Sequence, residues 1–235
     1  TRSRASDSFT SIEEGSGDLN TLLLAFALCH LGLLAWTFTW RGGAALWLLR
    51  LLLLGMCWDN LVQGLGHVYI DTEGYAIASR GRYLMHAAIL PLLTLFGLWV
   101  MRRAGVRAAQ APGFVLACWL VTLVALLYGL YHEAWLLELE PTANLGVEKL
   151  VSQSKTPPLA TIGTNLVLLL MAATVWRASA WPWLFLCGLF IFLVNGATAS
   201  LPWGFVAGNF AEIVFILGLL ATQRRFEPLV EESRS

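Results

Sequence analysis

Seven long apolar runs follow one another along this 235-residue chain, and they constrain its fold more than any other feature. They cover Thr21–Thr39, Ala44–Ile70, Tyr83–Met101, Phe114–His132, Leu159–Trp176, Trp183–Ser200 and Gly204–Thr222. A helix needs about 20 mostly apolar residues to cross a bilayer. Because the runs are continuous rather than alternating, a membrane β-barrel is excluded. The sequence therefore predicts an all-α, multi-pass integral membrane protein that folds as a seven-helix bundle.

The composition agrees with this prediction. Hydrophobic residues make up 57% of the chain and charged residues only 13%, about half the charged share of soluble domains. The formal net charge is zero, which argues against a nucleic-acid partner. All four cysteines lie inside the apolar runs without a CxxC pair, so we expect them to be packing residues.

The rest of the chain forms short segments around the bundle. Residues 1–18 are rich in Ser and Thr, so we expect a flexible N-terminal segment, which is compatible with the remnant of an organellar transit peptide. The transmembrane domain is predicted over residues 19–223, with a long outer loop at 133–158 and a tail at 224–235. In the loop, "AWLLELE" has the pattern of an amphipathic helix on the membrane surface. The loop either covers the bundle as a lid or only connects two helices.

Basic residues indicate the orientation of the bundle, because inner loops of membrane proteins carry an excess of Lys and Arg. With the N-terminus outside, nine arginines fall on the inner side: Arg41, Arg50, Arg102, Arg103, Arg107, Arg177, Arg224, Arg225 and Arg234. Six basic residues fall on the outer side: Arg2, Arg4, Arg80, Arg82, Lys149 and Lys155. We therefore expect the N-terminus outside and the C-terminus inside.

Asp59 interrupts the second apolar run, although a charged side chain at the bilayer centre costs about 2.5–3.5 kcal/mol. On a helical wheel it shares one face with Asn60, Gln63 and His67, while the opposite face is rich in Leu. Other helices supply polar residues at matching depth. We define the inner polar cluster as His30, Asp59, Asn60, Gln63, Asn195, Asn209 and Glu212. Such a cluster either specifies helix packing or serves proton transfer, ion binding or the grip on a ligand's polar head.

A second set of polar residues stands at the outer ends of the predicted helices. We define the outer polar cluster as His67, Arg82, His86, Tyr131, His132 and Glu133. Its three histidines stand on consecutive helices, and zinc hydrolases use three protein ligands and one water molecule. Neither HExxH nor HxxxH is present, however, and we expect no bound metal. The alternatives are a site for a phosphate or lipid head and ordinary interfacial polarity.

One stretch, "GRYLMHAAILPLL", resembles the third helix of microbial rhodopsins, which hold retinal on a lysine of the last helix. Both lysines of this chain, Lys149 and Lys155, lie in the outer loop, and Glu212 stands near the place of that lysine. A retinal Schiff base is therefore excluded. Alkaline-ceramidase-like membrane hydrolases also have seven helices, but their paired histidines in the last helix have no match here.

A closer resemblance covers most of the second to seventh runs. The motifs are "WDN" with "GLGH", "RYLMHAAILPLL" followed by "RRAGV", "WPWL", and "GNFAE" with "ATQRRFE". Together they are similar to an uncharacterised family of polytopic membrane proteins. The resemblance implies a shared fold and transfers no activity or catalytic residue.

Three functions are compatible with these features. The leading prediction is a protein that binds or carries a small amphiphile or lipid around Asp59 and Glu212, with or without coupling to protons. The first alternative is a metal-dependent membrane lipid hydrolase at the outer histidines. The second is a non-catalytic subunit of a larger membrane complex. The expected partners are accordingly membrane lipids, a small amphiphilic ligand and other membrane proteins.

Overall fold

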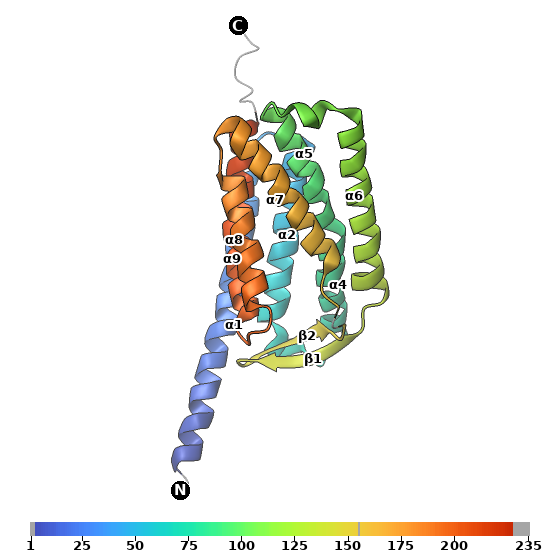
Figure 1. Ribbon diagram of the computed structural model, residues 1–235. Coiled ribbons are helices and arrows are strands. Elements are labelled where there is room, and N and C mark those ends of the chain that lie inside the picture. The colour runs from blue at the N-terminus through green and yellow to red at the C-terminus, as the bar shows by residue number, and fades with distance from the viewer. Residues whose placement is uncertain (1–2, 155, 228–235) are drawn as a thin grey trace.

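A computed structural model describes residues 3–154 and 156–227 (Figure 1). Its α-helices are α1 (Ser3–Thr37), α2 (Ala44–Gly64), α3 (Gly66–Tyr69), α4 (Glu73–Ile89), α5 (Leu93–Arg103), α6 (Pro112–Leu130), α7 (Leu159–Ser179), α8 (Trp183–Thr198) and α9 (Gly204–Phe226). Short turns of other helix types are η1 (Leu90–Leu92), η2 (Arg107–Gln110) and η3 (Tyr131–Trp135). The strands are β1 (Leu139–Asn144) and β2 (Val147–Ser152).

Within these described residues, six helical stretches are long and apolar enough to cross a bilayer. They are α1 from Asp18 onward, α2, the continuous stretch of α4, η1 and α5, α6 with η3, α7, and α9. Helix α8 is apolar but only 16 residues long. The protein is therefore a multi-pass integral membrane protein by the length and composition of its helices.

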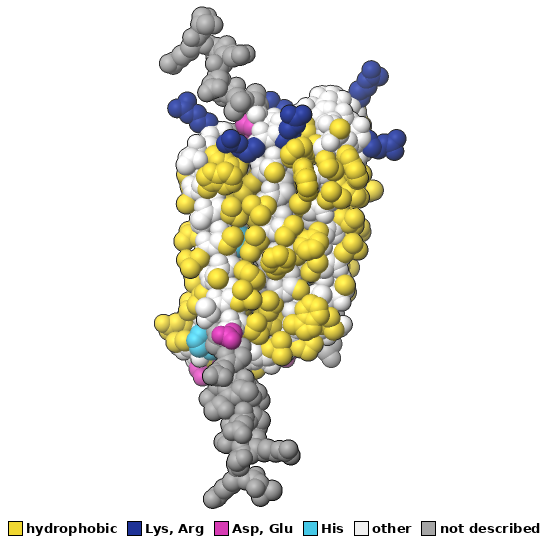
Figure 2. Space-filling model, turned by 90° about the vertical axis from the view of Figure 1, so that its left-hand side faces the viewer, with side chains coloured by type: hydrophobic (Ala, Val, Ile, Leu, Met, Phe, Trp, Pro, Cys, Tyr) yellow, Lys and Arg dark blue, Asp and Glu magenta, His cyan; other side chains and the backbone are white. Residues whose placement is uncertain are grey.

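The outer surface has the polarity that a bilayer requires. In Figure 2, hydrophobic side chains cover the flank of the bundle, and Lys and Arg side chains gather at one end. The basic residues in the last turns of α5, α7 and α9 are Arg102, Arg103, Arg177, Arg224 and Arg225. Large apolar side chains such as Leu28, Val124 and Leu170 are more than 60% exposed on the flank, where lipid chains would cover them.

Helix α2 runs through the interior of the bundle, where it contacts α1, α4, α5 and α9 (Figure 1). Leu49 and Leu53 on this helix are fully buried. Arg50, which interrupts its apolar half, is also buried and donates hydrogen bonds to the carbonyl oxygens of Thr37 at 2.7 Å and Trp40 at 3.2 Å. Carbonyl groups at and just after the end of α1 thus satisfy this charge inside the bundle.

The second helix is shorter than the sequence predicts. It ends at Gly64 rather than Ile70, and the one-turn α3 follows after Leu65. Helix α1 begins at Ser3, within the N-terminal segment that the sequence predicts to be flexible. Of the predicted C-terminal tail, residues 228–235 lie outside the described part of the chain.

The third transmembrane stretch starts ten residues earlier than predicted, at Glu73 instead of Tyr83. Thr72 caps it, because its Oγ1 accepts a hydrogen bond from the backbone N–H of Tyr75 at 3.2 Å. The helix continues through Pro91 by tightening into the 3-10 turn η1. The early start adds almost three turns of α4 at the end of the bundle that carries the hairpin.

The outer loop contains a β-hairpin, so the all-α prediction is wrong at this point, as is the amphipathic helix predicted over "AWLLELE". Strand β1 pairs with β2 in antiparallel register, from Leu139 opposite Ser152 to Asn144 opposite Val147. The turn residues Leu145 and Gly146 have φ angles of 52° and 78°, as a type I′ hairpin turn requires. Figure 1 shows the hairpin lying across one end of the bundle.

Close contacts hold the hairpin against the helices. A Cβ atom on Gly66 of α3 would lie 1.7 Å from the carbonyl oxygen of Glu148, so the strand backbone packs directly on the helix backbone. On the other side, the backbone N–H of Ser152 donates to Oη of Tyr83 on α4 at 2.9 Å. The hairpin therefore covers the end of the bundle. This position agrees with the first of the two predicted alternatives, in which the loop lies over the bundle.

Candidate functional site

An ion pair joins the polar face of α2 to α4. Nε of Arg82 donates to Oδ1 of Asp59 at 2.8 Å, and Nε2 of Gln63 donates to Oδ2 of the same carboxylate at 2.5 Å. The side chains of Arg82 and Asp59 are only 10% and 13% exposed. A charge removed from water needs a partner of opposite sign, and α4 supplies it. This contact explains how α2 carries an acid among apolar residues.

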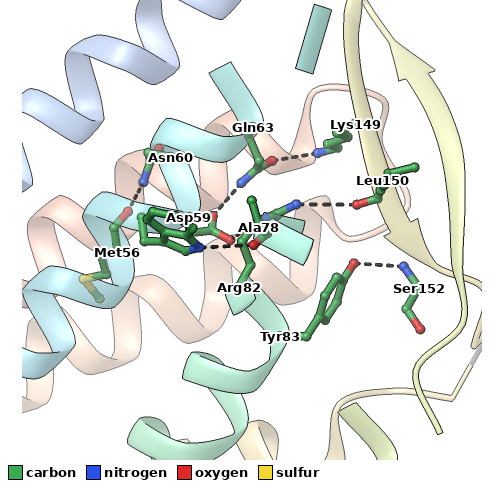
Figure 3. A network of polar contacts seen from close by, with 11 residues as sticks. Met56, Asp59, Asn60, Gln63, Ala78, Arg82, Tyr83, Lys149, Leu150 and Ser152 are labelled. Carbon is green, nitrogen blue, oxygen red and sulfur yellow. Dashed lines mark hydrogen bonds and ion pairs between the residues drawn. The ribbon is translucent and has the colours of Figure 1, made fainter. Parts of the chain in front are cut away.

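The hairpin extends the network, as Figure 3 shows. Nζ of Lys149 on β2 donates to Oε1 of Gln63 at 2.9 Å and lies 3.8 Å from the centre of the Phe205 ring on α9. Nη1 of Arg82 donates to the carbonyl oxygen of Leu150 at 3.5 Å. The chain of contacts thus runs from β2 through α2 to α4.

Lys149 is the most buried charged residue of the hairpin, with 6% of its surface exposed. Burial lowers the pKa of its ammonium group to about 8, the positive charge of Arg82 acts in the same direction, and Asp59 opposes both. The ammonium group is therefore mostly protonated at pH 7, and it loses its proton when the pH rises above about 8.

A cavity of about 450 Å³ adjoins this network. Its walls come from α2, α4, the end of α6, η3, strand β2, residues 154 and 156–158, α8 and α9. The volume falls in the range of small-molecule sites, about 300–1,000 Å³. Apolar side chains such as Val151 and Phe205 share the wall with the charged ones, so the cavity suits a ligand with both polar and apolar parts.

Glu212 on α9 supplies an acceptor for which the described part of the chain offers no donor. Its side chain lines the cavity, and its Oε2 is buried without a hydrogen-bond partner among the described residues. It also lines a smaller recess of about 50 Å³ together with Asp59, His86 and Asn195. Gly204 and Gly208 on the same helix also line the cavity, and both allow close packing. A Cβ atom on Gly204 would lie 2.0 Å from the carbonyl oxygen of Thr198, and one on Gly208 would lie 2.8 Å from Oδ1 of Asn195.

The two clusters predicted from the sequence form one site. Nine of their members line the 450 Å³ cavity: Asp59, Gln63, Arg82, His86, His132, Glu133, Asn195, Asn209 and Glu212. The inner and outer sets meet where Arg82 of α4 lies beside Asp59 of α2, which is one helical turn from Gln63.

Four predicted residues do not line the cavity. His30 is buried in α1 with Nδ1 2.9 Å from the carbonyl oxygen of Phe26, and Asn60 is buried with Nδ2 donating to the carbonyl oxygen of Met56 at 2.9 Å. Both are bonded within their own helices. His67 is exposed on α3, because α2 ends before it. Tyr131 is 54% exposed and contacts His132 edge to face.

The three histidines considered as metal ligands are not brought together. His86 and His132 line the cavity and His67 does not. Across residues 3–154 and 156–227, no three His, Cys, Asp or Glu side chains are placed to hold a metal ion. The three histidines proposed as zinc ligands therefore do not form a three-ligand site among these residues.

Sequence reasoning missed the contribution of the loop. Lys149, Ser152, Ser154 and Thr156 line the cavity together with Tyr83 and Phe205. The available signal was weak: in "VEKLVS", Val147, Lys149 and Val151 would share one face of a strand, but Leu150 lies on the other face, so polar and apolar residues do not alternate cleanly. A lysine on the apolar face of such a strand indicates a charge directed into the protein.

The chain matches no family model, no curated protein and no solved structure. The resemblance to an uncharacterised polytopic family therefore stays a prediction. Function has to be argued from the cavity and the helices around it.

Proposed function

We propose that all seven apolar helices cross the membrane, with the N-terminus outside and the C-terminus inside. Helix α8 packs between α7 and α9 and spans about 24 Å at 1.5 Å per residue, short of a 30 Å hydrocarbon core but within reach of a locally thinned bilayer. The arginines at the ends of α5, α7 and α9 mark the inner side. This orientation places the hairpin and the cavity at the outer face.

Within this membrane protein, we propose that the cavity binds the polar head of a small amphiphile or lipid. The observation that carries this proposal concerns Glu212, which lines the cavity and whose buried Oε2 has no hydrogen-bond partner among residues 3–154 and 156–227. A buried acceptor without a donor is costly, and a ligand that brings a donor removes that cost. The head should therefore carry a hydroxyl or ammonium group.

The other charged groups of the cavity suit the same ligand. Both carboxylate oxygens of Asp59 already accept hydrogen bonds, from Arg82 and Gln63. Asp59 therefore contributes to the cavity wall, and we do not assign it as the acceptor for the ligand. Lys149 has three N–H donors, of which one is used by Gln63. An anionic part of the head, such as a phosphate, would find its donor there, while Glu212 takes the hydroxyl or ammonium.

The test is the lipid content of the purified protein. Wild type is reconstituted into vesicles of phosphatidylethanolamine and phosphatidylglycerol, extracted in mild detergent, and weighed by native mass spectrometry for bound lipid. We expect about one retained lipid per chain for a single site. Glu212→Leu, which removes the acceptor at similar volume, should lose it. Glu140→Leu on the exposed side of β1 is the matched control and should retain it.

A second variant separates the two kinds of head. Glu212→Gln keeps one acceptor but loses the carboxylate, so it should retain a hydroxyl-bearing lipid better than an ammonium-bearing one. Equal lipid content in wild type and Glu212→Leu, with both proteins folded by melting temperature, would refute the headgroup site.

A further inference from the structure

A second hollow lies on the flank of the bundle between α6 and α7. Its volume is about 400 Å³, and its lining runs from Leu120 to Tyr128 on α6 and from Leu159 to Val167 on α7. Apart from Tyr128 and Thr164, every lining side chain is apolar or glycine. We call it the α6–α7 groove.

The groove adjoins the polar cavity. Tyr128 lines both hollows. At the start of α7, the cavity is lined by Pro158, which precedes the helix, and the groove is lined by Leu159, its first residue. A ligand in the cavity therefore has an apolar continuation at its side. The polar end and the apolar end of one amphiphile would meet at Tyr128, whose ring and hydroxyl suit such a boundary.

The dimensions and position of the groove fit one lipid chain. The lining covers nine residues on each helix, and eight rises of 1.5 Å span about 12 Å. This length is close to half of a hydrocarbon core of about 30 Å. Leu120 and Val124 on its α6 wall are 51% and 66% exposed, so the groove opens toward the membrane rather than toward water. It thus extends from the level of the cavity to about the middle of the bilayer.

Gly163 keeps this groove open. A Cβ atom built on it would meet nothing within 4 Å, whereas one built on Gly129 of α6 would contact Ala87 at 3.4 Å. Gly129 is small because a neighbouring helix packs against it, and Gly163 has no such neighbour. A glycine inside a helix destabilises that helix relative to alanine. At Gly163 the absent side chain leaves free space in the groove.

We propose that the α6–α7 groove holds one acyl chain of a membrane lipid whose head occupies the polar cavity. The lipid then reaches its site sideways from the leaflet on the hairpin side, without passing through water. This proposal rests on the headgroup site proposed above and adds the place of the tail and the route of access. A transmembrane helix is a less suitable occupant, because a helix about 10 Å wide would lie across the groove without using its junction with the cavity.

The experiment fills the groove and leaves the cavity unchanged. Gly163→Phe and the control Gly32→Phe, a lipid-exposed glycine of α1 with equally free space, are reconstituted in the vesicles described above. We expect Gly163→Phe to retain about tenfold less long-chain lipid, the equivalent of losing about two buried methylene groups. It should still bind the dihexanoyl forms of the same lipids as wild type does, and Gly32→Phe should behave as wild type.

Gly163→Cys, in a background with Cys29→Ser, covers the case in which Gly163→Phe does not fold. The folded protein is alkylated with N-benzylmaleimide, which adds the bulk after folding, and lipid retention is compared before and after alkylation. A fall in retention on alkylation supports the groove, and unchanged retention overturns it.

The other outcomes separate this proposal from the headgroup site. Undiminished long-chain lipid in Gly163→Phe overturns the groove, while loss of lipid in Glu212→Leu still supports the cavity. Loss of short and long lipids alike in Gly163→Phe also overturns the groove as a separate tail site. A smaller oligomer with unchanged lipid content would show that another protein copy covers the groove, which overturns the proposal as well. If only Gly163→Phe loses lipid and Glu212→Leu does not, the tail site stands and the headgroup site fails.

Discussion

Nε of Arg82 lies 2.8 Å from Oδ1 of Asp59, and this contact joins α4 to α2 where the hairpin covers the bundle. The two residues are 23 positions apart in the sequence. Both also serve the cavity wall, so the pair holds the shape of the site as well as the helices. Its partners Gln63 and Leu150 connect it to the hairpin.

Removing both members of this pair should cost less stability than the sum of removing each one alone. Asp59→Asn leaves the guanidinium of Arg82 without its carboxylate, and breaking one side of a buried pair costs on the order of 3 kcal/mol. In the double variant with Arg82→Gln, the loss should be clearly smaller than the sum of the two single losses. Thermal unfolding in detergent at pH 7 measures all four proteins of the cycle. Additive losses would mean that the pair contributes no coupling energy.

The pH dependence of stability should report the buried ammonium of Lys149, whose pKa lies at about 8 instead of 10.5. Below pH 8 the folded and unfolded chains both carry the charge, and the folded chain bears the cost of burying it. Between pH 8 and 10.5 the folded chain releases the proton while the unfolded chain keeps it, so this group's contribution to the free energy of unfolding rises with pH.

The variant Lys149→Met isolates this effect, because its side chain has similar length and no charge. We expect wild type to gain stability relative to Lys149→Met as the pH rises from 8 to 10.5, by on the order of 3 kcal/mol. Melting temperatures of both proteins over this range provide the measurement. Parallel pH profiles for the two proteins would contradict an ammonium group whose pKa is lowered by burial at this position.

The proposed topology predicts which side of the membrane each loop faces. Single cysteines at Glu140, Ser200, Ala108 and Ala178, all exposed positions, are introduced in a background without the four native cysteines. Impermeant maleimide applied to oriented membranes should label Glu140→Cys and Ser200→Cys from the outside. It should reach Ala108→Cys and Ala178→Cys only from the inside. Labelling of Ser200→Cys and Ala178→Cys from one side would show that α8 does not cross.

Much of the fold was readable from the chain because membrane helices follow a local rule. Each apolar run carries its own evidence of length and hydropathy, and the helices of the structure coincide with the runs to within a few residues at most ends. The larger errors have two origins. Thr72 is a capping residue visible in the sequence, and it predicts the early start of α4. Strand β2 had no such signal, because "VEKLVS" mixes polar and apolar residues on both faces of a strand.

The polar residues were also identified from the sequence, because a carboxylate or histidine in an apolar run is conspicuous wherever it points. Their grouping was not. Two clusters were expected at different depths, while nine of their members share one cavity, and His30 and Asn60 bond within their own helices instead. A helical wheel gives the direction of a side chain relative to its own axis but not the rotation, tilt or depth of the neighbouring helix.

The sequence by itself therefore determined the membrane environment, the helices and the presence of buried polar groups, since each depends on residues within about 20 positions of one another. Only the tertiary structure decided that Arg82 neutralises Asp59, that Lys149 reaches Gln63 across 86 positions, and that Glu212 keeps a free acceptor. It also decided that a groove adjoins the cavity at Tyr128. These relationships depend on how separate helices pack, and packing is set by the fit of whole surfaces rather than by any local pattern.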